Sequence, residues 1–269
     1  MAAFQDIQQR ETGLRQQLSA AQMVMIAIGG AIGTGLFMGS AFAIGFAGPS
    51  VLVSYAIGAV ISLLLMGCLA EMTVAHPTSG SFGAYAEHYI APWAGFVVRY
   101  AYWACVVLAV GTEVTAVGLY MGYWFPEVPR WAWVVIFSGA LIGVNMMSVK
   151  AFGAVEYSFS MIKIIAIVAF IVVGAWVVFG TRPAGVGFAN YVNNGGFFPN
   201  GLWGTWVGVI IAIFSYLSIE MIAVAAGEAK DPQRAVTSAF RSTMVRLVVF
   251  YLATICLLYT SDAADDSLR

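Results

Sequence analysis

The sequence has 269 residues, of which 61% are hydrophobic and only 9% are charged. Soluble globular domains are about 45–50% apolar and about 25% charged, so this composition excludes an ordinary soluble enzyme, a disordered chain and a nucleic-acid-binding protein. The formal net charge of -1 indicates no strongly basic or acidic surface. The useful unit for interpreting the chain is therefore the membrane span of about 20 apolar residues.

Residues 1–19 are polar and lack an apolar core behind a basic start, so they do not resemble a secretory signal peptide. We expect them to form a cytoplasmic segment, followed by a transmembrane domain over 20–259. The apolar stretches are continuous rather than alternating, which predicts an all-α polytopic membrane protein rather than a barrel. About seven spans are expected: 20–44, 50–74, 94–122, 131–149, 157–180, 202–226 and a seventh that begins near Thr243.

The distribution of Lys and Arg predicts the orientation, because positive residues accumulate in cytoplasmic loops. The side that carries the N-terminus also holds Arg10, Arg15, Arg99, Lys150, Lys230, Arg234, Arg241 and Arg246, whereas the other side holds Arg130 and Arg182. We therefore expect the N-terminus to be cytoplasmic. A seven-helix receptor, which the bare helix count suggests, would place its N-terminus outside and is disfavoured.

The last residues, 260–269, are polar and follow the apolar run Leu247–Tyr259, which is short for a span. Two interpretations remain open. The seventh helix could include Arg246 near its cytoplasmic end, or the true helix could continue and 260–269 could be foreign sequence from an incomplete or frameshifted gene. We favour the second, in which the transmembrane domain is incomplete.

The first span contains five glycines, Gly29, Gly30, Gly33, Gly35 and Gly39. Glycine costs up to about 1 kcal/mol in a helix interior, so the helix is weak here. If it unwinds, the freed backbone groups must line a polar cavity, and the next half-helix would point its positive end at a carboxylate. The alternative is close helix packing, since two pairs of these glycines fit the GxxxG pattern.

Ionisable residues inside spans are costly and therefore suggest function. Glu113, Lys163 and Glu220 are the three cases. Lys163 could snorkel to the headgroups, or it could face the bundle interior and exchange a proton. Glu220 could cap unwound backbone or titrate, and Glu113 could simply reach the outer interface.

The sixth span is interrupted by a polar cluster, Ser215, Tyr216, Ser218 and Glu220. This is a weaker break than the first because it has no glycine. The two serines could merely bond back to their own helix.

The chain contains no sequence pattern for a soluble active site, a P-loop or a metal site, so neither an enzyme nor a cofactor is expected. The histidines, His76 and His88, are few and distant in sequence. Cys68, Cys105 and Cys256 lie in apolar runs and are expected to be buried thiols.

Six motifs occur in an order that resembles the bacterial amino acid permeases of the amino acid–polyamine–organocation superfamily, over roughly residues 12–258. They are the glycine run 28–39, Pro77–Phe82, Glu113–Ala116, Ser148–Gly153, Gly195–Asn200 and Gly227–Pro232. The resemblance implies a twelve-helix transporter with an inverted repeat of five plus five helices, in which helices 1 and 6 are broken. This chain would hold the first repeat and two helices of the second.

The resemblance also implies roles for individual residues. The amides of Gly33, Thr34 and Gly35 would hold the substrate α-carboxylate. The carbonyls near Phe214 and Leu217 would receive the α-ammonium, and Phe214 or Tyr216 would close over the substrate. Lys163 matches a lysine whose charge replaces a sodium ion in proton-coupled members.

One departure concerns substrate choice. The family usually has glycine where this chain has Ser218, so the side-chain pocket could be narrower or more polar. The resemblance implies a multi-pass permease of the cytoplasmic membrane that carries an amino acid by proton symport and alternating access. An exchanger without net proton flow and a non-functional fragment are the alternatives.

Overall fold

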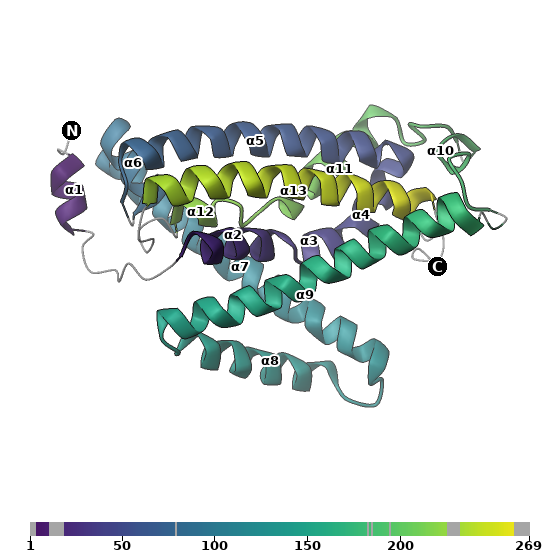
Figure 1. The fold of residues 1–269 in the computed structure, drawn as a ribbon, viewed down its shortest axis with the longest axis horizontal. Coiled ribbons are helices and arrows are strands. Elements are labelled where there is room, and N and C mark those ends of the chain that lie inside the picture. Colours follow the sequence, from purple (N-terminus) through teal and green to yellow (C-terminus); the bar gives the residue numbers. More distant parts are fainter. Residues whose placement is uncertain are drawn as a thin grey trace. The chain divides into compact units, whose positions relative to one another are not determined.

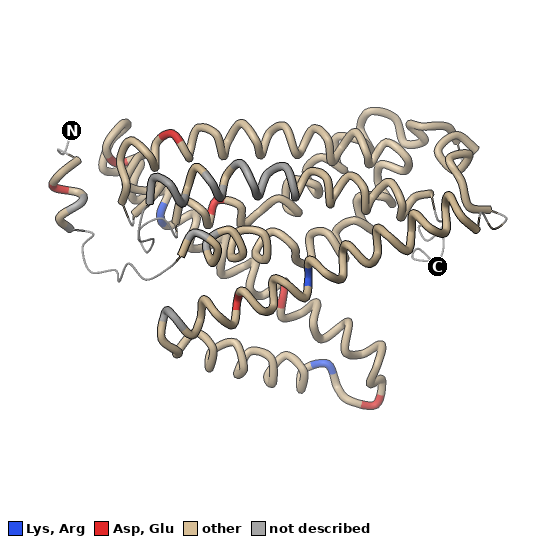
Figure 2. Tube along the Cα trace, viewed as in Figure 1, with Lys and Arg blue, Asp and Glu red and all other residues tan. Residues whose placement is uncertain are grey.

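The computed structural model describes residues 4–10, 19–78, 80–181, 183, 185–193, 195–224 and 232–260. Within these ranges the regular structure is helical and no β-strand occurs, which agrees with an all-α chain. Figure 2 shows long stretches of helix without a charged residue. Three segments, Gly39–Ala75, Pro92–Trp124 and Ala151–Thr181, are long and apolar enough to cross a membrane. The remaining apolar helices are shorter, so the count of about seven spans stays a prediction.

Figure 1 shows the helices in chain order. They are α1 (Phe4–Arg10), α2 (Ala20–Ala31), α3 (Thr34–Phe37), α4 (Gly39–Ala47), the 3₁₀ turn η1 (Gly48–Ser50), α5 (Val51–Ala75), α6 (Ser81–Tyr89), α7 (Pro92–Trp124), α8 (Arg130–Asn145), α9 (Val149–Ala175), the π-helix η2 (Trp176–Thr181), α10 (Asn190–Asn193), α11 (Gly201–Ser215), α12 (Met221–Val224) and α13 (Pro232–Thr260).

Several boundaries differ from the predicted ranges. The first and sixth spans are each divided by a break, as the resemblance implied for helices 1 and 6. The short helix α6 was missed because nine residues are too few for a span. Helix α9 begins at Val149 rather than near residue 157, so Lys163 lies about four turns from its start. Helix α13 begins at Pro232 rather than near Thr243, so it includes Arg246. The helix therefore extends through polar residues that precede the apolar run Leu247–Tyr259. The tail 261–269 and residues 225–231 lie outside the described residues.

The chain divides into two compact units. The first unit comprises residues 1–23, 69–156 and 223–237, and the second comprises 24–68, 157–222 and 238–269. In the first unit, α6 packs on α7 and α7 packs on α8. Arg99 of α7 donates a hydrogen bond from Nη1 to Glu87 Oε2 of α6 at 2.8 Å. Gly83 and Gly95 allow these two helices to approach closely.

The two histidines, His76 and His88, are distant in sequence but close in space. Their ring centroids are 5.7 Å apart in the first unit. The Phe4 ring of α1 packs against both, tilted against His76 and edge to face against His88. Among the described residues, however, no cluster of three metal-ligating side chains occurs. The expectation for the cysteines was wrong, because Cys68 and Cys105 are exposed and Cys256 is half-buried.

The second unit is held together by close packing of α4 and α5 against α11. Small residues permit it, since a β-carbon on Gly208 would lie 2.6 Å from Ser54 Oγ and 3.0 Å from Ala47 Cβ. Buried hydroxyls add specific links: Ser50 Oγ lies 2.7 Å from Thr205 Oγ1, and Ser54 Oγ donates to the Thr205 carbonyl at 2.8 Å. This packing fixes α11 beside the helices of the first predicted span.

Candidate functional site

The first predicted span is interrupted at Ile32 and Gly33. Helix α2 ends at Ala31, Gly33 is extended with φ -143° and ψ -155°, and α3 begins at Thr34. The first N–H groups of a helix have no acceptor within it, so the amides around Gly33, Thr34 and Gly35 lie at a helix start. Met38 keeps helical dihedral angles between α3 and α4, so the helical path continues to Ala47. The sequence therefore located this break correctly.

Side chains from two other helices cap the end of α2. The break removes the helical partners of its last carbonyls, which must find other donors. The Lys163 ammonium of α9 donates to the Gly29 carbonyl at 2.7 Å. The Tyr251 hydroxyl of α13 donates to the Ala31 carbonyl at 2.5 Å. Lys163 therefore points to the broken helix instead of snorkelling to the headgroups.

The sixth predicted span breaks after Ser215, where α11 ends, and α12 resumes at Met221. The intervening residues form tight turns, with Leu217 N–H donating to the Phe214 carbonyl at 3.2 Å. Ser218 has φ +78°, a left-handed conformation that favours glycine. Ser218 therefore occupies a backbone position that would suit glycine, and the serine is strained there.

The two breaks lie against each other in the second unit. A β-carbon on Gly35 would lie 2.7 Å from Ser215 Cα and 3.2 Å from the Phe214 carbonyl oxygen. A β-carbon on Gly30 would lie 3.0 Å from Ser218 Cβ. Ser215 Oγ donates to the Gly35 carbonyl at 2.6 Å. Ser215 thus bonds across the breaks, so the interpretation that it only bonds back to its own helix is wrong.

The glycines of the first span fit both interpretations that the sequence left open, helix unwinding and close helix packing. Gly33 lies at the unwound turn, as the break required. Gly29 and Gly35 allow close packing, because a β-carbon on either would overlap Ser160 or the backbone of Ser215. The unwinding and the packing interpretations are therefore compatible.

Three buried tyrosines lie beside the breaks, and two of them, Tyr55 and Tyr251, were missed in the sequence. Tyr55, Tyr216 and Tyr251 are at most 3% exposed, and their ring centroids lie 4.8–6.3 Å apart. Tyr55 Oη lies 3.1 Å from Ser215 Oγ, and the Tyr216 hydroxyl donates to the Tyr55 carbonyl at 3.2 Å. Tyr55 and Tyr251 each stand within an apolar run, where an aromatic residue commonly marks packing or an interface.

The other predicted residues are distributed as follows. Thr34 is 6% exposed, and Phe214, Leu217 and Ser218 are half-buried. Glu220 is also half-buried and lies in the second break. These residues share the second unit with Lys163, whereas Glu113 is exposed on α7 in the first unit. The structure thus brings the predicted substrate residues and Lys163 into one unit, whereas Glu113 belongs to the other.

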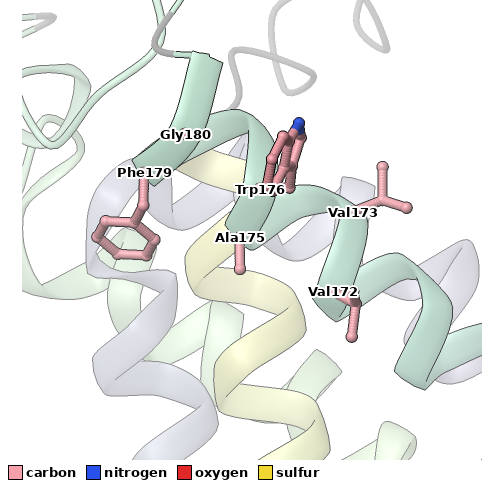
Figure 3. Close-up of a pocket in the computed structure, with 6 residues that line it drawn as sticks. All are labelled: Val172, Val173, Ala175, Trp176, Phe179 and Gly180. Atoms are coloured by element: carbon pink, nitrogen blue, oxygen red, sulfur yellow. The ribbon is translucent and has the colours of Figure 1, made fainter.

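A surface hollow of 580 Å³ lies elsewhere in the second unit and is formed by the end of α9 and η2 (Figure 3). Its lining is almost entirely apolar: Val172, Val173, Ala175, Trp176, Phe179 and Gly180. It therefore offers little to recognise charged ends of a substrate. None of the residues at the two breaks lines it.

An all-helical chain with long apolar segments and two interrupted helices in contact is typical of a membrane transport protein. Residues 22–267 match the family model described as amino acid permease. This chain belongs to the amino acid permease family.

Three curated relatives illustrate the range of the family. The chain is 41% identical over 251 residues to the gamma-aminobutyric acid permease of Bacillus subtilis (strain 168), covering 93% of this chain. It is 38% identical over 266 residues to the aromatic amino acid transport protein AroP of Escherichia coli (strain K12), covering 97%. It is 38% identical over 250 residues to the probable threonine/serine transporter YbxG of Bacillus subtilis, covering 92%. The chain spans only 54–58% of the length of these relatives.

Proposed function

We propose that this protein is a secondary-active permease that takes up an amino acid across the cytoplasmic membrane by alternating access, with its N-terminus in the cytoplasm. The observation that supports it best is the contact between the two breaks, where Gly35 meets Ser215. This contact brings the start of one half-helix to the end of another. Because the start carries partial positive charge and the end partial negative charge, the pair complements a zwitterion.

In this proposal the amides of Gly33, Thr34 and Gly35 hold the substrate carboxylate. The carbonyls near Phe214 and Leu217 accept hydrogen bonds from its ammonium. Of the two candidates for closing over the substrate, we favour Phe214, since it is half-buried while Tyr216 is 3% exposed within the tyrosine cluster. Ser218 contributes to the side-chain pocket, so substrate choice should differ from that of relatives with glycine there.

We further propose that uptake is coupled to protons and that Lys163 exchanges the coupling proton. A charged ammonium forms a strong hydrogen bond to a carbonyl, and the partial negative charge of a helix end adds to it. Loss of the proton would weaken the link from α9 to Gly29 and so loosen the end of α2. Glu220, in the second break, is a second candidate for proton exchange.

The test is uptake of radiolabelled phenylalanine, threonine and γ-aminobutyrate by proteoliposomes that contain the full gene product, under an imposed pH gradient. We expect one of the three to accumulate with the gradient and Lys163→Ala to abolish that dependence. Lys150→Ala removes the same charge elsewhere and should leave the dependence intact. Uptake by Lys163→Ala that still followed the gradient would refute the role of Lys163. Counterflow insensitive to pH would identify an exchanger instead, and failure to carry any amino acid would refute transport.

A further inference from the structure

One buried hydroxyl joins the ends of both broken helices. Tyr251 is fully buried on α13, and its Oη lies 2.5 Å from the Ala31 carbonyl oxygen and 2.8 Å from the Ser215 carbonyl oxygen. Ala31 is the last residue of α2, and Ser215 is the last residue of α11. The same hydroxyl is therefore within hydrogen-bonding distance of two helix ends that the breaks leave without their usual partners.

Electrostatics explains why a donor is needed at this point. The C-terminal end of a helix carries about half a negative charge on its free carbonyls, so two such ends repel each other when they meet. A phenol has a single proton, which can be directed to either carbonyl or shared between them. Tyr251 thus offsets the repulsion between α2 and α11 and ties the two ends together.

The surrounding cluster holds the Tyr251 ring in place. The ring packs against Tyr216 with centroids 4.8 Å apart and against Tyr55 edge to face at 6.3 Å. Ser215 Oγ links Tyr55 to the Gly35 carbonyl. Tyr55 belongs to α5, Ser215 ends α11 and Tyr216 follows it directly. Because the Tyr251 ring packs among residues of both elements, its hydroxyl has little freedom to follow only one of the two helix ends.

We infer that Tyr251 is a positioning residue that sets the spacing between the two helix breaks. Since the proposed site binds a carboxylate at one break and an ammonium at the other, this spacing determines how well both ends of one molecule are held at once. The second part of the inference rests on the proposed function. Removing the Tyr251 hydroxyl should therefore weaken the binding of ligands that carry both a carboxylate and an ammonium more than the binding of ligands that carry only one of them.

The first test measures the spacing without any substrate. Gly30 and Ser218 stand opposite each other across the breaks, with Cβ positions 3.0 Å apart. This is shorter than the roughly 3.5–4.5 Å between the β-carbons of a disulfide, so cysteines at both positions can bridge after a small outward shift of the backbone. In a background without the three native cysteines, we expect the pair Gly30→Cys and Ser218→Cys to oxidise rapidly. We expect Tyr251→Phe to slow it about fivefold or more. Tyr123→Phe removes a hydroxyl from a residue that is 84% exposed and is the matched control. Equal rates with and without the Tyr251 hydroxyl overturn the inference.

The second test measures binding to the full gene product in detergent. Phenylalanine is compared with 2-phenylethylamine and 3-phenylpropionate, and γ-aminobutyrate with propylamine and butyrate. We expect Tyr251→Phe to raise the Kd of the two-ended ligand about tenfold and to change the Kd of the one-ended ligands less than twofold. An equal loss for all three ligands of a set indicates general damage and overturns the inference.

The two tests separate the inference from the proposed function. If oxidation depends on Tyr251 but wild-type protein neither binds nor carries any amino acid, the proposed function fails while the positioning role stands. If Tyr251→Phe does not fold, Tyr251→His supplies a shorter donor. The Gly30→Cys and Ser218→Cys pair should then oxidise more slowly with Tyr251→His than with the native Tyr251. An unchanged rate in that variant overturns the inference.

Discussion

Gly29 of α2 lies directly against Ser160 of α9, so that a β-carbon on Gly29 would overlap Ser160 Oγ and lie 2.7 Å from Ser160 Cβ. The Gly29 carbonyl also accepts the Lys163 hydrogen bond at 2.7 Å, from a residue almost one turn further along α9. This contact therefore fixes the broken helix α2 against the helix that carries the proposed proton-coupling residue.

Gly29→Ala should destabilise the protein by about 3 kcal/mol, because the new methyl group overlaps a fully buried side chain. Adding Ser160→Gly removes both overlapping atoms and should recover most of the loss. The measurement is the thermal unfolding midpoint of purified protein in detergent. Gly67→Ala is the control, since nothing lies within 4 Å of that position, and the better helix propensity of alanine should make it neutral or slightly stabilising. An equal loss in the single and double variants would contradict this packing.

Ser160→Ala should stabilise the protein. Ser160 Oγ is fully buried and has no hydrogen-bond partner among the described residues. A buried polar group without a partner costs about 1–3 kcal/mol, so replacing the hydroxyl by hydrogen should gain about 1 kcal/mol. The measurement is again the thermal unfolding midpoint in detergent. Ser50→Ala is the control and should shift the midpoint in the opposite direction. Ser50 Oγ bonds to the Ala47 carbonyl and Thr205, so its removal should lower the midpoint.

Hydropathy and glycine content were enough to predict the long apolar helices and the position of the first break. Both depend on local properties, namely the length of apolar runs and the weakness of helices rich in glycine. The partners across the breaks could not be predicted, because they depend on how distant helices pack. Tyr251 shows the reason: within the apolar run Leu247–Tyr259 nothing distinguishes a residue that caps two helix ends from one that faces lipid. Ser218 was noticed as part of a polar cluster within an apolar span, but its left-handed backbone could not be predicted from that pattern.

Gly35→Ala should be more damaging than Gly39→Ala, although both glycines fit the same GxxxG pair. At Gly35 the nearest atoms are backbone atoms of Ser215, which cannot rotate away, so α3 and α11 must separate. We expect a loss of about 3 kcal/mol or failure to fold. At Gly39 the neighbours are 3.6 Å or more away, an ordinary contact, and the change should be within about 1 kcal/mol. Comparing yield and unfolding midpoint for both variants checks this, and similar behaviour of the two would show that the Gly35 contact is not tight. Loss of transport in Gly35→Ala would not by itself identify a binding role.

Ser218→Gly should raise stability because the residue has φ +78° in the second break. A left-handed conformation costs a residue with a β-carbon about 1–2 kcal/mol, while glycine brings an entropic cost of about 0.5–1 kcal/mol on folding. The net gain should be about 0.5–1 kcal/mol. Ser138→Gly, within the regular helix α8, makes the same chemical change where the dihedral angles are ordinary, and it should instead lose about 0.5–1 kcal/mol. Opposite shifts of the unfolding midpoint are therefore expected in the two variants. A fall in both would mean that Ser218 contributes a contact worth more than its backbone strain, and the packing of its β-carbon against Gly30 would then be the first contact to test.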